Sequence, residues 1–230
     1  RFLENLNSPA YKIASFENKD LNLIKEISKK KKPIIMSTGM ATLDEIKNAF
    51  NVIKKYSSRK NFALLKCTSS YPAPYQDSNL RTIVDMKKKF KCEIGLSDHT
   101  IGTLSAVAAI TLGSTIIEKH ICLNKKTGID AFFSSTPQEM KKLVNESKLC
   151  FKSKGKIFYG PSKSEKKSII NRRSLFALKN KKKNEKFSWE NIISLRPVIG
   201  IDAKFYKRVI NKTSCKNIEK NKAIKWDMIK

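Results

Sequence analysis

The chain has 230 residues, 40% of them hydrophobic, so it is long enough and apolar enough to bury a sizeable core. No stretch reaches the roughly 20 consecutive apolar residues of a membrane-spanning helix, so we expect no contact with a membrane. The net charge of +28 is typical of nucleic-acid binding. However, 48 basic residues less seven Arg leaves 41 Lys, which recognises bases and phosphates less specifically than Arg, so we expect no specific nucleic-acid partner.

The five cysteines are scattered and have no CxxC spacing, which predicts neither a disulfide framework nor a structural zinc site. Residues 1–10 begin with Arg and lack the apolar core and cleavage pattern of a signal peptide. Both features are typical of a cytoplasmic protein. We also expect the native start of the chain to lie upstream of Arg1.

Between Tyr11 and Cys150, short apolar runs alternate with longer amphipathic segments. Such nearly continuous apolar runs are typical of parallel strands covered on both faces, and they predict strands at 11–15, 33–37, 63–68, 93–97 and 115–120. The amphipathic segments predict helices at 19–30, 41–56, 79–90, 102–112 and 137–152. This alternation predicts an α/β fold with a parallel sheet.

Every predicted strand ends in polar or charged residues, as expected where the carboxyl ends of barrel strands form an active-site face. A closed (β/α)8 TIM barrel needs eight strands and about 250 residues, and only five strands are found here. We therefore predict that residues 1–163 are the C-terminal part of a TIM barrel that lacks about its first three β/α units.

The pattern changes after the last predicted helix. Gly155, Gly160 and Pro161 precede a charged stretch, which predicts a linker at 164–171. Short strand-like runs at 174–177, 192–195 and 224–226, with a short helix at 204–210, then predict a small β-rich domain over residues 172–230.

The only two histidines, His99 and His120, each lie at the end of a predicted strand. Adjacent strands would bring them together, and two imidazoles with open positions for water and substrate suit a divalent first-row metal. The alternative is that each is a hydrogen-bonded polar residue without a ligand. Asp98 and Glu118, beside them in sequence, are candidates either for orienting the imidazoles or for structural ion pairs.

A second polar group follows the first predicted strand. Lys12, Ser15 and Glu17 stand at alternate or near-alternate positions, so at least two should face the barrel interior. A buried Lys requires an anion, and Ser15, Ser69 and Ser97 are hydroxyl donors at the ends of neighbouring strands. The sequence thus favours a small phosphate- or carboxylate-bearing substrate over a structural Lys–Glu pair.

Five segments resemble the sialic acid synthase family, whose members condense phosphoenolpyruvate with a 2-acetamido sugar to make N-acetylneuraminate, pseudaminate or legionaminate. The resemblance spans nearly the whole chain, and the motifs that carry it are YKIASFE from Tyr11, PIIMSTGM from Pro33, LKCTSSYPAP from Leu65, IGLSDHT from Ile94 and IEKHI from Ile117. The family has a TIM barrel followed by an antifreeze-like (SAF) domain that reaches over the partner's active site in a domain-swapped homodimer. The resemblance therefore implies that residues 172–230 are such a domain.

By this resemblance, His99 and His120 match ligands of a divalent metal, Mn²⁺, Mg²⁺ or Co²⁺, and Glu17 a catalytic acidic residue close to it. The positions that bind phosphoenolpyruvate match Lys12, Ser15, Ser69 and Ser97. Those around the amino sugar match Tyr71, Asp130 and Arg196. In the implied reaction, the metal polarises the open-chain aldehyde, the enol carbon of phosphoenolpyruvate attacks it, and water captures C2 before phosphate leaves.

The segments from Asp130 and Arg172 resemble the pseudaminate branch most, and the apolar Phe132–Phe133 pair suits a 6-deoxy sugar. The alternatives are an N-acetylneuraminate or legionaminate synthase, another phosphoenolpyruvate-condensing barrel that uses an aldose phosphate, and an inactive fragment with a carbohydrate-binding antifreeze-like domain. The chain departs from the family pattern at Val198 and at 181–185, which lacks an expected turn Gly. Because the absent strands carry an essential acidic residue in the family, we expect that the chain alone is inactive.

Overall fold

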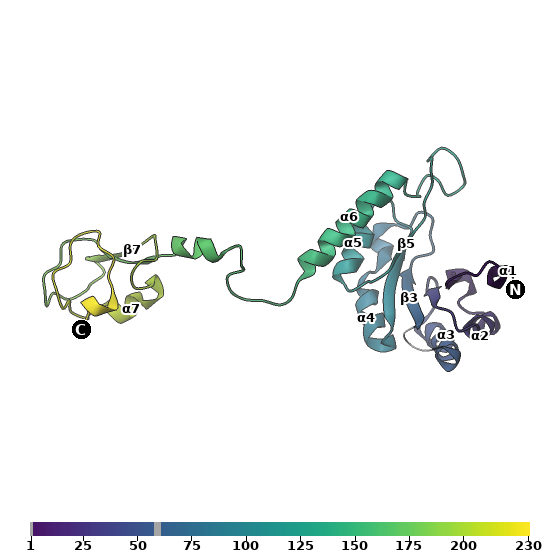
Figure 1. Ribbon diagram of the computed structural model, residues 1–230, viewed down its shortest axis with the longest axis horizontal. Helices are drawn as coiled ribbons and strands as arrows, with labels where there is room; N and C mark the ends of the chain where they lie inside the picture. Colours follow the sequence, from purple (N-terminus) through teal and green to yellow (C-terminus); the bar gives the residue numbers. More distant parts are fainter. Residues whose placement is uncertain (1, 58–60) are drawn as a thin grey trace. The chain divides into compact units, whose positions relative to one another are not determined.

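The computed structural model describes residues 2–57 and 61–230 (Figure 1). The chain forms two compact units, Arg1–Lys156 and Ile157–Lys230. In the sequence, the expected linker at 164–171 lies inside the second of these units, where Lys166–Asn171 forms the short 3-10 helix η4. Within the described residues, no helix is both long enough and apolar enough to cross a membrane.

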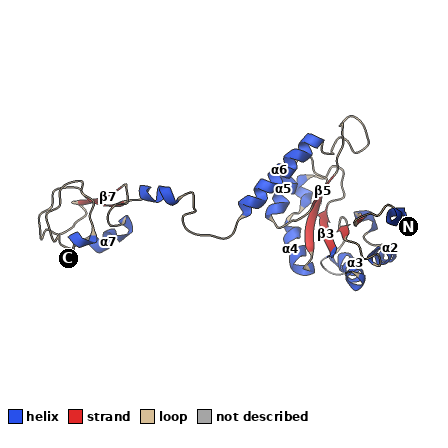
Figure 2. Ribbon diagram, in the orientation of Figure 1, coloured by secondary structure: helices blue, strands red, loops and turns tan. Residues whose placement is uncertain are grey.

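The first unit is built on one parallel sheet of five strands in the order β1-β2-β3-β4-β5. The sheet is curled, and the helices alternate with its strands along the chain (Figure 2). The five predicted strands are confirmed, with bounds β1 Tyr11–Ile13, β2 Ile34–Ser37, β3 Phe62–Cys67, β4 Glu93–Asp98 and β5 Ile117–Lys119. The helices of this unit are α1 Phe2–Asn5, η1 Ser15–Glu17, α2 Leu21–Ser28, α3 Leu43–Tyr56, η3 Tyr75–Ser78, α4 Arg81–Phe90, α5 Leu104–Thr111 and α6 Pro137–Lys154.

The two faces of the sheet differ in composition, because successive side chains of a strand point to opposite sides. The side chains on one face of the sheet pack against α2, α3, α4 and α5 in a single buried core. The strand residues of this core include Ile34, Met36, Leu64, Ile94 and Leu96. On the other face, the strands end in polar side chains, among them Lys12, Cys67, Ser97 and Glu118. The fold thus places a polar set on the face that the helices do not cover.

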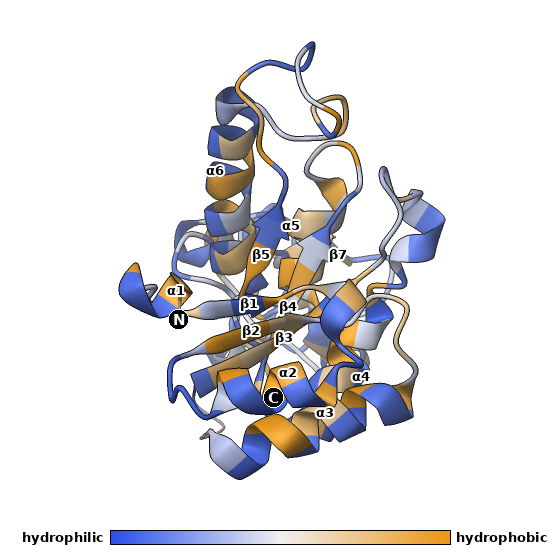
Figure 3. Ribbon diagram, turned by 90° about the vertical axis from the view of Figure 1, so that its right-hand side faces the viewer, coloured by the Kyte–Doolittle hydropathy of each residue, from blue (hydrophilic) through white to orange (hydrophobic). Residues whose placement is uncertain are grey.

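Helix α6 is amphipathic, with hydrophobic and hydrophilic residues alternating along its length (Figure 3). Its first turn is fixed by a capping box, in which Thr136 accepts from the Glu139 N–H and Glu139 accepts from the Thr136 N–H. Helix α3 begins with the same arrangement at Thr42 and Glu45, as the sequence predicts.

The second unit contains a two-stranded antiparallel sheet of β6 and β7 around its own apolar core. Its elements are β6 Ser174–Ala177, β7 Ile192–Leu195, η5 Ala203–Phe205, α7 Tyr206–Val209 and η6 Trp226–Met228. The predicted strand at 224–226 is wrong. Ile224 bonds to Leu175 and Ile201, but the chain then turns into η6, so the pairing does not continue.

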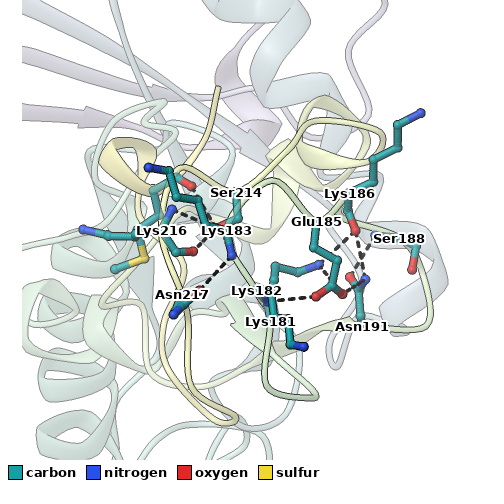
Figure 4. A network of polar contacts seen from close by, with 11 residues as sticks. Lys181, Lys182, Lys183, Glu185, Lys186, Ser188, Asn191, Ser214, Lys216 and Asn217 are labelled. Atoms are coloured by element: carbon teal, nitrogen blue, oxygen red, sulfur yellow. Dashed lines mark hydrogen bonds and ion pairs between the residues drawn. The ribbon is translucent and has the colours of Figure 1, made fainter.

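A buried lysine organises one turn of the second unit (Figure 4). The Lys181 side chain is 0% exposed, and its ammonium contacts Glu185 at 3.1 Å, donates to the Lys186 carbonyl at 2.9 Å and lies over the Phe187 ring. In place of the turn Gly expected at 181–185, Asn184 adopts φ 66°. Asn tolerates this left-handed conformation better than most residues, so the turn forms without Gly.

Candidate active site

His99 and His120 follow the last residues of β4 and β5, which are adjacent strands. Their ring centroids lie 5.1 Å apart, so the expected adjacency of the two histidines is confirmed. His99 is 7% exposed, and its Nδ1 lies 2.8 Å from the Thr68 carbonyl oxygen. Because a carbonyl only accepts, Nδ1 carries the proton, and neutral His99 keeps its Nε2 lone pair free.

The two imidazoles differ in basicity. Burial lowers the pKa of His99, but contacts with Cys67 and the Thr68 carbonyl outweigh it and raise the pKa above its ordinary value. Burial, together with the neighbouring His99, lowers the pKa of His120. His120 is therefore the ring that stays neutral to lower pH.

The pair fits a divalent metal as a site with two nitrogen ligands. In the described part of the chain, no group of three or more His, Cys, Asp or Glu is placed to hold a metal ion. Two imidazoles would leave the remaining positions to oxygen ligands such as water or substrate. Asp130 lies near this pair, with Oδ2 3.6 Å from His120 Nδ1.

Three aromatic residues, Tyr71, Phe132 and Phe133, form an aromatic wall on one side of the histidines. The Tyr71 ring lies 4.3 Å from the His99 ring and 5.8 Å from the His120 ring, measured between centroids. Phe133 is buried and lies 5.0 Å from His120, while Phe132 packs edge-on against Phe133 and remains 56% exposed. One side of the site is thus apolar, and Tyr71 and Asp130, both predicted from sequence, lie beside the histidines.

Lys12 and Ser97 meet at one carboxylate on the same face of the sheet. Ser97 donates to Glu118 Oε1 at 2.7 Å, and Lys12 Nζ lies 3.4 Å from the same oxygen. The Lys12 side chain is 33% exposed, and among the described residues Glu118 supplies the carboxylate that forms an ion pair with it. A Lys–Glu contact exists, but Lys12 makes it with Glu118 instead of Glu17.

Ser15 and Ser69 converge on Gly39, after β2. Ser15 Oγ accepts from the Gly39 N–H at 3.0 Å. A Cβ placed on Gly39 would lie 2.2 Å from Ser69 Oγ and 2.7 Å from Ser15 Oγ, so the approach of both hydroxyls requires glycine here. The structure therefore brings these two predicted residues together.

Two further predicted residues are Glu17 and Arg196. Glu17, at the end of η1, is half-buried, and within residues 2–57 and 61–230 its carboxylate makes no hydrogen bond or ion pair. Arg196 follows β7 in the second unit, where it is exposed. The roles predicted for both residues remain predictions.

Two further groups at the strand ends were not predicted from the sequence. Burial raises the pKa of the Cys67 thiol, but hydrogen bonds with His99, Ser15 and Ser69 outweigh it and lower the pKa to about 7. Ser37 is buried, and its hydroxyl has no hydrogen-bond partner among the described residues. Both could have been identified by their position in the sequence, because each is the last residue of its strand and its side chain points to the uncovered face.

Comparison with known proteins shows which family this chain resembles in sequence and fold. The NeuB family model matches residues 1–159. Pseudaminic acid synthase from Campylobacter jejuni is 42% identical over 97% of this chain and 65% of its own length, and N,N'-diacetyllegionaminic acid synthase from the same organism is 42% identical over 97% and 68%. The crystal structure of an N-acetylneuraminic acid synthetase from Leptospira borgpetersenii, in complex with citrate, is 34% identical, with a TM-score of 0.67 over 73% of this chain and 58% of that one.

The chain spans 65% of the length of the Campylobacter pseudaminic acid synthase, slightly less than two thirds. The family model covers residues 1–159, which include the five strands and both histidines. On this evidence of sequence and fold, the chain belongs to the NeuB family.

Proposed function

We propose that this chain carries the active-site half of a synthase that condenses phosphoenolpyruvate with an open-chain 2-acetamido sugar, giving a nonulosonic acid and phosphate. The supporting observation is the meeting of His99, His120, Lys12 and Glu118 on one uncovered face at the carboxyl ends of parallel strands. That edge is where TIM-barrel enzymes carry their catalytic groups. The similarity to two synthases of such acids supports the same reaction.

The donor would be held by charge and hydroxyl groups. Lys12 would attract the phosphate and carboxylate of phosphoenolpyruvate, with Ser15, Ser69 and Ser97 as hydrogen-bond donors. Because Lys12 lies 3.4 Å from Glu118, an incoming anion would compete with that carboxylate for the ammonium group. Binding the donor in a fixed orientation supplies much of the rate enhancement expected of such a site.

A divalent metal, Mn²⁺, Mg²⁺ or Co²⁺, would be held by His99 and His120. Bound there, it would polarise the aldehyde of the acceptor. The proton on His99 Nδ1 is held by the Thr68 carbonyl, which keeps Nε2 available as a ligand atom. Glu17, whose carboxylate has no partner among the described residues, would orient the water that adds to C2 and accept its proton.

The acceptor would be a 2,4-diacetamido 6-deoxy sugar of the pseudaminate type. The aromatic wall of Phe133 and Tyr71 beside His120 offers an apolar surface and few partners for a 6-hydroxyl. The equal identity of 42% to a pseudaminic and a diacetyllegionaminic acid synthase does not separate the two acceptors. The aromatic residues favour a 6-deoxy acceptor over one that carries a 6-hydroxyl, and the pseudaminate type is chosen on the resemblance of the segments from Asp130 and Arg172.

The second unit would be an antifreeze-like domain that completes the sugar site of a partner in a domain-swapped homodimer. Arg196 would contact the N-acyl group of the sugar, and its exposure leaves the guanidinium accessible. Both substrates are small anionic or polar metabolites, so a cytoplasmic location fits this function.

The test is phosphate release from phosphoenolpyruvate with Mn²⁺ and each candidate amino sugar. It would use the 230-residue chain and a chimera in which this chain replaces its matching region of the Campylobacter jejuni pseudaminic acid synthase. We expect release by the chimera with the 6-deoxy diacetamido sugar, loss of release in His120→Ala, and retention in the surface control Lys142→Ala. Absence of release with every sugar, from both proteins, would favour an inactive fragment.

A further inference from the structure

A buried ion pair joins β4 and β5 on the face opposite the candidate active site. Asp98 and Lys119 are partners in the strand register, and Lys119 Nζ lies 2.9 Å from Asp98 Oδ2. Each side chain is only 2% exposed. Both residues continue the row that packs under the helices, where the preceding positions, Leu96 and Ile117, are apolar.

The pair also holds the residue that follows His99. Asp98 Oδ1 accepts from the Thr100 N–H at 2.9 Å and from the Thr100 hydroxyl at 2.8 Å. Lys119 Nζ donates to the Thr100 carbonyl at 2.5 Å. The residues before and after His99 are therefore both bonded to Lys119, Asp98 through its carboxylate and Thr100 through its carbonyl. Lys119 in turn directly precedes His120.

On the other face, the neighbouring residues form the candidate site. Ser97 and Glu118 are bonded at 2.7 Å, and the rings of His99 and His120 follow them at 5.1 Å. Because side chains alternate along a strand, a slip of one residue between β4 and β5 would carry one histidine to the wrong face. The ion pair opposes such a slip where the strands end.

We propose that Asp98 and Lys119 are positioning residues that set the spacing and direction of the two imidazoles. A buried pair is a poor means of stabilisation, since apolar residues of similar volume often serve as well. Its directional bonds, however, fix one register and one backbone path around His99. This inference rests on the proposed function for its catalytic meaning, but the spacing of the rings can be measured without metal or substrate.

The test compares the parent chain with the double variant Asp98→Asn/Lys119→Met. The amide oxygen introduced by Asp98→Asn can still accept from Thr100, so the local turn remains. The double variant loses the charged link across the strands and the bond from Lys119 to the Thr100 carbonyl. Removing both charges leaves neither group buried without its partner, so the variant is expected to fold. Lys181→Met, which removes the buried ammonium of the second unit, is the matched control.

The first readout is a nuclear Overhauser effect between the imidazole protons of His99 and His120, which can be assigned because the chain has only two histidines. We expect the cross-peak in the parent and in Lys181→Met, and a severalfold weaker one in the folded double variant. An unchanged cross-peak in the folded double variant would overturn the proposal. If the double variant does not fold, Lys119→Arg serves instead, because it keeps the positive charge and changes the length and shape of the side chain. The same weakening of the His99–His120 cross-peak is expected in this variant.

The second readout is Co²⁺ binding by calorimetry and by visible absorption. We expect the double variant to bind about 10- to 100-fold more weakly than the parent, as is typical when groups that orient metal ligands are lost. If the parent and His120→Ala both fail to bind Co²⁺ while the cross-peak still depends on Asp98 and Lys119, the metal in the proposed function is wrong and the positioning role stands. Co²⁺ binding that the folded double variant retains in full, with an unchanged spectrum, contradicts the positioning role.

Discussion

Cys67 is a buried thiol whose pKa of about 7 depends on its neighbours, chiefly His99. About half of this thiol should therefore be thiolate at neutral pH, with the thiolate forming as the pH rises through about 7. We predict that the absorbance at 240 nm, taken as the parent minus Cys67→Ser, rises with a midpoint near this pH. In His99→Phe the midpoint should move toward the ordinary value of 9.0. A midpoint that His99→Phe leaves unchanged would contradict the assigned hydrogen bond.

Gly39 lies in the candidate site and Gly95 lies within strand β4, and a methyl group added at each would meet different neighbours. In Gly39→Ala the new methyl would meet the ends of the Ser15 and Ser69 side chains, which can rotate away, whereas in Gly95→Ala it would meet the Ile116 carbonyl at 2.5 Å. We predict that Gly95→Ala lowers the free energy of unfolding by about 3 kcal/mol or more and Gly39→Ala by about 1 kcal/mol.

Gly39→Ala should nevertheless weaken phosphoenolpyruvate binding, measured by calorimetry, by about tenfold or more, because the displaced hydroxyls lose charge-assisted hydrogen bonds. Equal binding by Gly39→Ala and the parent would remove Ser15 and Ser69 from the proposed donor site. Thermal unfolding of both variants, followed by circular dichroism, provides the control for folding.

The capping box of α3 gives a prediction with a defined pH dependence. A hydrogen bond with Lys19, followed by the Thr42 N–H, lowers the pKa of Glu45 from 4.5 to about 2. Because the folded pKa is depressed, the stabilisation by Glu45 is fully present above the unfolded value of 4.5 and is lost as the pH falls through about 2. Glu45→Gln should therefore lower the local stability of α3 at pH 7, seen as faster hydrogen exchange, and should resemble the parent near pH 2.

Thr42→Ala removes the other half of the same box and should lower the local stability of α3 by about 1 kcal/mol. Hydrogen exchange of peptides covering 43–56 measures this directly, with the matching box at Thr136 on α6 as an internal reference. Equal exchange in Thr42→Ser and faster exchange in Thr42→Ala are expected, because Ser retains the hydroxyl. Faster exchange in both would mean that the Thr methyl, instead of the cap, supports the helix.

The five strands and the five longer helices of the first unit could be predicted from sequence because each is encoded locally, whereas the short helices α1, η1 and η3 were not predicted. The runs at 34–37 and 62–67 are apolar on both faces, and the Thr42–Glu45 pattern marks where α3 begins. The adjacency of His99 and His120 also followed, since parallel strands end at one edge. By contrast, the strand expected at 224–226 does not form, because Ile224 bonds to Leu175 and Ile201 while the carbonyls of Lys225 and Trp226 accept bonds of the turn into η6.

The individual bonds between side chains of different strands could not be predicted, because they depend on register. Lys12 pairs with Glu118, which lies more than a hundred residues away, although Glu17 is nearer in sequence. The pairing of Asp98 with Lys119 and the contact of Cys67 with His99 likewise require knowing which residue lies opposite which. A sequence pattern shows which side chains share a face, but the bonds among them follow from the fold.

At the scale of the whole molecule, each of the two units has its own hydrophobic core. The first core includes Ile24, Ile53 and Leu64, and the second includes Leu175 and Phe187. Both tryptophans, Trp189 and Trp226, belong to the second unit, so their fluorescence reports on that unit alone.

We predict that residues 157–230 fold when expressed alone, because Phe187 and the apolar residues around it are buried within that unit. Its tryptophan emission and unfolding midpoint should match those of the same residues in the full chain. Phe187→Ala, which empties the centre of this core, should destabilise both forms by about 3–5 kcal/mol and leave the exchange of 43–56 unchanged. A red-shifted, unfolded emission from residues 157–230 alone, beside a native emission in the full chain, would instead show that the second unit requires the first in order to fold.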